Sequence, residues 1–442
     1  MPNAQGTRES AVSAADETPR LPSLKRNVSW TLFGNVLYSL SSWLMFAVIA
    51  KMGTPKMVGQ YALGLAVTQP IIMFAQLNLR AVQATDVHKL YRFGHYLALR
   101  LAMALLSVVV AVAVALVGHY EAETALVIIA VAVGVAFDSY SDVVYGALQQ
   151  REQMNRIAIS MAVKGPLSLL LLALGLYVGN SVVWAAVGSA LASIIVSTSY
   201  DYASVRKLFA GGKGELAEID GLEAKPRWER GELWNLARLA FPMGITLVLV
   251  ALNTNIPRFF LEHFAGEAQL GIYAALASVI AAGRIVVNAL GQTATPRLAR
   301  NYAHHEMAKF RELTVCLLVT AVVLGAALTW LAAQYGNRLV ASIYTAEYGR
   351  YINVFVVSVL SGGVGYLATF IGFALTACRY FKPQVPILLV VCIITSISCA
   401  VLVPRLGALG AAYGTLIGMI AQVAASAAAL VVVMRDRERQ PA

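Results

Sequence analysis

The sequence predicts an all-α protein that crosses a membrane many times, because its composition and its apolar runs do not fit a soluble fold. Of the 442 residues, 59% are hydrophobic and only 13% are charged, which is about half the charged share of a typical soluble domain. Long stretches carry no charge, such as Leu101–Val117, Leu313–Ala333 and Val385–Pro404. A run of roughly 20 apolar residues spans the hydrocarbon core of a bilayer as a helix.

About twelve membrane-spanning helices are expected, since each run is close to the length that a bilayer requires. Polar connections separate them, and the connection at Gly179-Asn180-Ser181 is very short. The predicted spans are Val28–Ala50, Val58–Leu79, Phe93–Val117, Thr124–Leu148, Ile157–Val178, Val182–Val205, Leu233–Asn253, Leu270–Gly291, Leu313–Ala333, Asn353–Ala377, Val385–Val403 and Ala408–Met434.

The Lys and Arg residues are distributed unevenly between the two sides of these spans. Loops rich in Lys and Arg stay in the cytoplasm, so we expect both termini there, with 24 of the 34 basic residues on the cytoplasmic side and 6 outside. Residues 1–23 have no signal-peptide pattern and are expected to form a disordered cytoplasmic tail, and 435–442 a second tail. The net charge of +11 is then explained by anionic lipid headgroups and needs no nucleic acid.

An internal repeat divides the chain into two lobes. The polar linker 206–232 separates an amino-terminal lobe of six spans, 24–205, from a carboxy-terminal lobe of six spans, 233–434. In both lobes the second span opens on the same motif, since 58–62 (Val-Gly-Gln-Tyr-Ala) aligns with 270–274 (Leu-Gly-Ile-Tyr-Ala). Six spans return the chain to the same side. We therefore expect two pseudo-symmetric lobes related by an axis along the membrane normal, around a central cavity.

Short motifs along most of the chain match a known family in their order and spacing. They are Leu24-Lys25-Arg26-Asn27-Val28-Ser29-Trp30, Val58-Gly59-Gln60-Tyr61-Ala62, Asn78-Leu79-Arg80, Tyr145-Gly146-Ala147-Leu148-Gln149-Gln150-Arg151-Glu152, Asn253-Thr254-Asn255-Ile256-Pro257-Arg258, Gly271-Ile272-Tyr273-Ala274 and Thr295-Pro296-Arg297-Leu298-Ala299. Together they resemble the Wzx-type polysaccharide biosynthesis, or O-antigen, flippases, from about Leu24 to Arg435. That family belongs to the superfamily of lipid II flippases and MATE drug exporters. The chain departs from it at Pro257, where many relatives have an acidic residue.

The resemblance implies a transporter of the bacterial inner membrane whose cavity opens alternately to each side. Its cargo would be similar to an undecaprenyl-diphosphate-linked oligosaccharide, moved from the inner to the outer leaflet. The expected partners are this lipid-linked oligosaccharide, membrane lipids, H⁺ or Na⁺ as a coupling ion, and other polysaccharide assembly proteins.

Charged residues inside spans indicate functional sites, because a charge in lipid is costly. The amino-terminal half carries Arg100, Asp138, Asp142 and Lys164 within its spans. Asp138 and Asp142 lie four residues apart on one helix face, so they can pair with Lys164 and Arg100. Two interpretations stay open: a network that locks the lobe, or a site for gating or for a coupling ion.

The carboxy-terminal half has Arg284 within a predicted span and no acidic residue in any span. An unpaired buried guanidinium is costly, and its planar fork suits phosphate oxygens, so Arg284 is predicted to line the cavity and bind a diphosphate. Arg80 and Arg258 close spans and either bind the same headgroup or anchor lipid phosphates. Asn35 and Asn255 suit sugar hydroxyls, although polar residues there equally serve helix packing.

No motif for catalysis, nucleotide binding or metal binding is found. The chain lacks the glycine-rich phosphate loop, and its four cysteines (Cys316, Cys378, Cys392 and Cys399) have neither zinc nor redox spacing. We therefore expect no catalytic residue, no metal and no cofactor. Two alternatives to a flippase are a MATE-like exporter of organic cations, which the cationic second half disfavours, and a polymerase or ligase, which the short outer loops disfavour.

Overall fold

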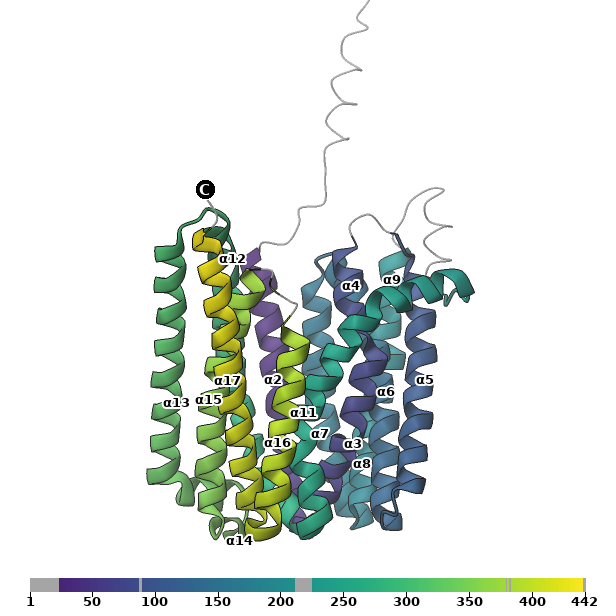
Figure 1. Ribbon diagram of the computed structural model, residues 1–442. Helices are drawn as coiled ribbons and strands as arrows, with labels where there is room; N and C mark the ends of the chain where they lie inside the picture. The colour runs from purple at the N-terminus through teal and green to yellow at the C-terminus, as the bar shows by residue number, and fades with distance from the viewer. Residues whose placement is uncertain (1–23, 87–89, 211–224, 379, 381–382, 440–442) are drawn as a thin grey trace, which may run out of the picture.

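A computed structural model describes residues 24–86, 90–210, 225–378, 380 and 383–439. Every regular element in these segments is a helix, and the long helices lie side by side in one bundle (Figure 1). The expected tail at 1–23 lies outside the described residues. The last helix continues past the predicted end of its span at Met434 as far as Arg439.

The first half of the chain builds the group of helices on one side of the bundle (Figure 1). Its elements are α2 (Leu24–Met52), α3 (Pro55–Gln76), α4 (Leu79–Thr85), α5 (Phe93–Val117), α6 (Ala122–Gln150), α7 (Met154–Gly179), α8 (Val182–Val196), a π-helix (Ser197–Asp201) and α9 (Tyr202–Ala210). Thr54 caps α3 by accepting a hydrogen bond from Met57 N at 3.3 Å, and Pro55 occupies the first turn, where a missing N–H is tolerated. Asn180 ends α7 with a left-handed φ of 47°.

The second half begins with α11 (Arg230–Ser278), in which two helical segments meet at Gly266. The other elements of this half are α12 (Ile280–Ala303), α13 (Met307–Ile343), α14 (Ala346–Gly349), α15 (Ile352–Ala377), α16 (Gln384–Leu406) and α17 (Ala408–Arg439). Gly266 interrupts α11 with a φ of 79° and a ψ of 172°, a conformation that glycine adopts readily. There the chain reverses and returns through α12 (Figure 1).

The number of crossings agrees with the sequence prediction. Eleven helices of the described chain are long and apolar enough to span a membrane. That set counts α11 as one helix, although the chain reverses within it at Gly266, and it omits the more polar α12. The segment that returns from Gly266 through α12 therefore supplies the twelfth crossing. The predicted span Leu270–Gly291 is divided at Val279, where α11 ends and α12 begins.

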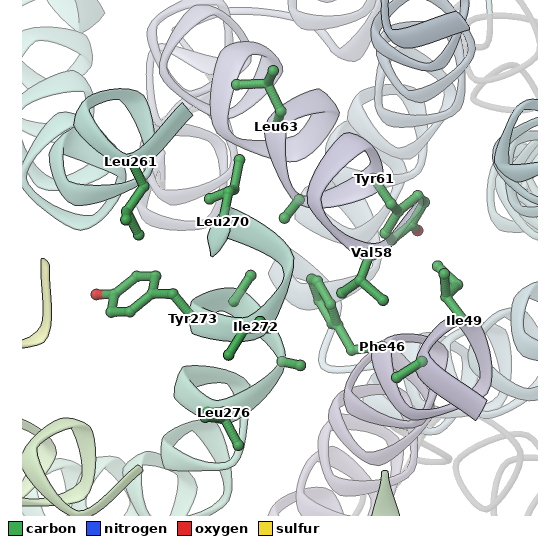
Figure 2. Packing of buried hydrophobic residues seen from close by; sticks show 14 of the residues in the cluster. Phe46, Ile49, Val58, Tyr61, Leu63, Leu261, Leu270, Ile272, Tyr273 and Leu276 are labelled. Atoms are coloured by element: carbon green, nitrogen blue, oxygen red, sulfur yellow. The ribbon is translucent and has the colours of Figure 1, made fainter. Parts of the chain in front are cut away.

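The largest hydrophobic core contains many residues of both halves and lies towards one end of the bundle. Figure 2 shows this core, in which α3, carrying Val58 and Leu63, lies beside the segment of α11 that carries Leu270 and Ile272. We call this end, where α3 begins and α11 reverses at Gly266, the shared-core end. It lies opposite α4, α9 and the last turn of α17 (Figure 1).

At the opposite end of the bundle the buried residues form two clusters, and only the first turns of α11 connect one of them to the second half. One cluster joins residues of the first half, such as Leu79, Phe93 and Leu148, with Leu236 and Ala240 from the first turns of α11. A different cluster belongs to the second half alone, and it includes Phe310, Phe370 and Leu430. The first turns of α11 thus pack on the amino-terminal half before the helix crosses to its own half. The halves converge towards the shared-core end.

Candidate functional site

The first half contains the network of charges that the sequence predicted. Arg100 of α5 donates from Nη2 to Asp142 Oδ2 at 2.8 Å. Lys164 of α7 donates from Nζ to Asp138 Oδ1 at 2.9 Å. Asp138 and Asp142 extend from the same face of α6, because they are one helical turn apart. Both cations are almost fully buried, with 1% of Arg100 and 3% of Lys164 exposed.

Arg80 joins this network at the end away from the shared core. Leu77 and Asn78 adopt left-handed φ values of 48° and 51°, which end α3 at Gln76, so Arg80 lies in α4 and not at the close of the predicted span. Its Nη1 is 3.6 Å from Asp142 Oδ1, and its Nε donates to Gln149 Oε1 at 3.1 Å. The guanidinium therefore bridges two residues of α6.

Asp201 belongs to the same network, although the sequence reasoning missed it. It lies within the predicted span Val182–Val205 and ends the π-helix, with no exposed surface. Ser160 Oγ donates to Asp201 Oδ1 at 2.6 Å, and Asp201 Oδ2 is 3.8 Å from Lys164 Nζ. The polar run 197–201 (Ser-Thr-Ser-Tyr-Asp) was the available signal, since such a run inside an apolar span indicates a functional position.

The second half contains a cavity of about 230 Å³ around Arg284. Residues of α11, α12, α15, α16 and α17 line it, among them Asn253, Thr254, Thr369 and Gln422. The side chain of Arg284 is exposed and forms no ion pair with any residue that the structure describes. The other lining residues are hydroxyl and amide side chains interspersed with apolar ones, so the arginine is the positive charge of an otherwise neutral wall.

A matching cavity of about 150 Å³ lies in the first half. Residues of α2, α3, α6, α7 and α8 line it, which are the first, second, fourth, fifth and sixth crossings of that half. The cavity around Arg284 uses the same crossings of the second half. Asp138 lines the first cavity, together with Ser42 and Ser193. The repeat therefore places two equivalent cavities in the bundle, one with a carboxylate and one with a guanidinium.

The other predicted site residues occupy different positions. Asn255 has no exposed surface; its Nδ2 donates to Gln69 Oε1 of α3 at 2.9 Å, and its Oδ1 accepts from Arg258 Nη1 at 3.1 Å. It thus joins the two halves in this conformation. Asn35 is exposed on α2 and donates to Thr31 O at 2.8 Å, and neither cavity described above includes it.

The repeated glycines close the shared-core end. A Cβ atom on Gly59 would lie 1.8 Å from Glu267 O, and one on Gly271 would lie 1.9 Å from Pro55 O. Only glycine allows this approach of α3 and α11, as small residues do at membrane helix contacts. Glu267 directly follows the chain reversal at Gly266. Its carboxylate accepts a hydrogen bond from Thr124 Oγ1 of α6.

No group of three metal-ligating side chains occurs among the described residues. No disulfide joins cysteines of the described chain.

These features define a multi-pass membrane transporter fold of two similar halves. The lipid II flippase MurJ in an inward closed conformation superposes with a TM-score of 0.68, at 11% identity, covering 91% of this chain and 88% of MurJ. An inward-facing multidrug resistance MATE transporter of the MOP superfamily gives 0.63 at 13% identity, covering 94% and 96%. A MOP superfamily transporter from Pyrococcus furiosus, described as having a binding pocket of reverse polarity, gives 0.61 at 13% identity, covering 93% and 95%.

Residues 24–302 match the polysaccharide biosynthesis protein family, and the chain belongs to that family. A curated relative is the capsular polysaccharide biosynthesis protein CapF of Staphylococcus aureus, which is 25% identical over 390 residues, or 88% of this chain and 94% of CapF. The resemblance found in the sequence is therefore confirmed, and so is the predicted fold class.

Proposed function

We propose that this protein is a flippase for a lipid-diphosphate-linked oligosaccharide of the undecaprenyl-diphosphate type. It moves this cargo from the inner to the outer leaflet of the bacterial inner membrane, for the assembly of a surface polysaccharide. The observation that carries the proposal is Arg284, a guanidinium without an acidic partner in the described chain, in a cavity whose wall includes several hydroxyl and amide side chains. An anionic headgroup that carries sugars is complementary to this wall, because its phosphate oxygens suit the guanidinium and its sugar hydroxyls suit the hydroxyl and amide side chains.

The proposed transport cycle is based on the difference in packing between the two ends of the bundle. The two halves contribute extensively to one core at the shared-core end, whereas at the other end only the first turns of α11 pack on the first half. This difference supports a state that admits cargo from that other end. Arg284 then binds the diphosphate, the sugars contact the polar wall, and the lipid tail stays in the bilayer. Closing that end and parting the shared-core end would release the cargo on the other side, as in alternating access.

Energy for the cycle comes from H⁺ or Na⁺ acting at the network of Asp138 and Asp142, or from the membrane potential acting on the charged cargo. The potential contributes roughly 2.3 kcal/mol per charge per 100 mV. A MATE-like exporter of organic cations has weaker support, because Lys164 already neutralises the carboxylate of Asp138. Within this proposal Arg80 and Arg258 receive the headgroup at the two ends of the path, and Asn35 and Asn255 contact sugar hydroxyls when the halves separate.

The proposed orientation places both termini in the cytoplasm. The turn between α12 and α13, which contains Glu306, lies at the same end as the last turn of α17, and Glu347 of α14 lies at the shared-core end (Figure 1). In a variant without native cysteines, we expect a membrane-impermeant maleimide to label Glu347→Cys in intact spheroplasts. Glu306→Cys should react only after the membrane is opened. The reverse labelling pattern would contradict the orientation.

Replacing Arg284 by glutamine is expected to lower transport by about tenfold or more, since hydrogen bonds to charged groups contribute roughly 1.5–3 kcal/mol. Cells without the gene should accumulate lipid-diphosphate-linked glycan on the cytoplasmic leaflet. The intact gene should clear it, Arg284→Lys should clear it in part, and Arg284→Gln should fail.

Arg238→Gln is the matched control for this experiment. Arg238 lies exposed near the start of α11 and outside the cavity, so this variant should transport normally. If Arg284→Gln clears the glycan at normal abundance, Arg284 does not bind the headgroup. If cells without the gene accumulate no glycan and still export it, the flippase proposal fails, and efflux of organic cations becomes the next assay.

A further inference from the structure

Oxygen atoms surround the ammonium group of Lys164 in the interior of the first half. The Nζ atom lies 2.9 Å from Asp138 Oδ1, 2.7 Å from Ser141 Oγ and 3.4 Å from Ser197 Oγ. A further carboxylate oxygen, Asp201 Oδ2, lies at 3.8 Å. These four oxygens come from α6 and from the π-helix, whereas the lysine comes from α7. Two carboxylates and two hydroxyls thus converge on one buried point.

The oxygens that surround this point are held by their own contacts. Ser141 Oγ and Ser197 Oγ are 2.7 Å apart, and Ser197 Oγ also donates to Phe137 O at 3.1 Å. Ser160 holds Asp201 Oδ1, whereas Asp201 Oδ2 is fully buried and has no hydrogen-bond partner in the described chain. That orphaned oxygen faces the ammonium, so the pocket is built around a positive charge.

Carboxylate and hydroxyl oxygens arranged in this way are ligands that hard metal cations prefer. The ammonium of lysine is a compact point charge that can satisfy such oxygens by donating up to three hydrogen bonds. Asp138 also lines the cavity of about 150 Å³ in this half, so one of the four oxygen-bearing side chains borders a space that a free ion could enter.

We propose that Lys164 is a tethered cation, which fills a site that would otherwise bind a free monovalent cation such as Na⁺. The wild-type protein therefore does not take up Na⁺ at Asp138 and Asp201. Removing the ammonium opens the site to Na⁺ or to a small alkylammonium ion. This inference rests on the proposed function only in that it limits which ion can couple to transport. It concerns ion binding alone, so its test can succeed or fail independently of whether the protein transports the proposed cargo.

The test measures thermal unfolding of the purified full-length protein in detergent. Sodium chloride or methylammonium chloride replaces choline chloride at constant ionic strength. Lys164→Ala should unfold at a temperature higher by about 2 °C or more in Na⁺ or methylammonium than in choline, a shift that corresponds to a ligand stabilising the native state. The wild type should show no difference between the salts. Adding Asp138→Asn to Lys164→Ala should abolish the response.

Two results would overturn the proposal. One is a Na⁺-specific rise in the wild type that Asp138→Asn removes, because the lysine would then not exclude the ion. The other is a folded Lys164→Ala that responds to neither cation. Lys164→Met keeps most of the side-chain volume and replaces the alanine variant if that variant does not fold. If neither variant folds, binding of radioactive ²²Na⁺ to the wild type decides: binding that depends on Asp138 contradicts the tethered cation, and its absence supports it.

Discussion

Replacing Gly271 by alanine is expected to separate α3 from α11 at the shared-core end and to shift the protein away from its present conformation. The added Cβ would lie 1.9 Å from Pro55 O and 2.7 Å from Gly59 N, and both are backbone atoms that cannot rotate away. Overpacking of this kind costs about 1–3 kcal/mol and occasionally more. Since every 1.4 kcal/mol changes an equilibrium about tenfold, the closed arrangement should lose most of its population.

Cross-linking across the shared-core end measures this change. Thr124 of the first half and Glu267 of the second are joined by a hydrogen bond, so cysteines at these two positions should react rapidly with a short bifunctional maleimide when the native cysteines are removed. Gly271→Ala should slow this reaction about tenfold. Gly372→Ala in α15 is the control, because a Cβ there meets no atom within 4 Å. An unchanged rate in Gly271→Ala would show that α3 and α11 are not held together by this contact.

Asp142→Asn is expected to destabilise the protein by about 3–5 kcal/mol, the range for breaking a buried ion pair by removing one partner. Arg100 is 1% exposed, and its Nε and Nη1 have no hydrogen-bond partner in the described chain. Its charge is therefore compensated mainly by the carboxylate of Asp142, 2.8 Å from Nη2. Without that carboxylate a buried guanidinium remains.

Thermal unfolding in detergent compares the stability of Asp142→Asn with that of the wild type and of a double variant. Adding Arg100→Met to Asp142→Asn should recover most of the lost stability, because a neutral pair of similar volume removes the uncompensated charge. Glu121→Gln serves as the control, since its exposed pair with Lys56 should contribute at most about 1 kcal/mol. If the double variant is less stable than Asp142→Asn alone, Arg100 stabilises the lobe through contacts other than its charge.

The crossings and the pairs Arg100–Asp142 and Lys164–Asp138 could be predicted from the sequence, because they depend on local properties. Apolar length determines whether a segment spans a membrane, and a separation of four residues puts two acids on one helix face. The same reasoning failed for Asp201. That residue lies near the predicted end of an apolar run, and it was not counted among the charges inside spans.

Other features depend on how the two halves meet, which a single sequence does not encode locally. The hydrogen bond from Asn255 to Gln69 joins helices far apart in the chain and belongs to the conformation described here. The close contact of Gly59 with α11 likewise depends on how the two halves meet. The repeat motif contained both glycines, yet its sequence could not reveal that the two copies touch each other.

The contact between those copies has the geometry of a symmetric homodimer within one chain. Pro55 and Glu267 each lie four residues before a repeated glycine, and each presents its carbonyl oxygen to the glycine of the other half. In a two-fold dimer, residue i contacts j while j contacts i, and here Gly59 contacts Glu267 while Gly271 contacts Pro55. This reciprocity is the pattern expected of an ancestral subunit that paired with its own copy, and it places the contact of α3 with α11 on the pseudo-two-fold axis of the protein.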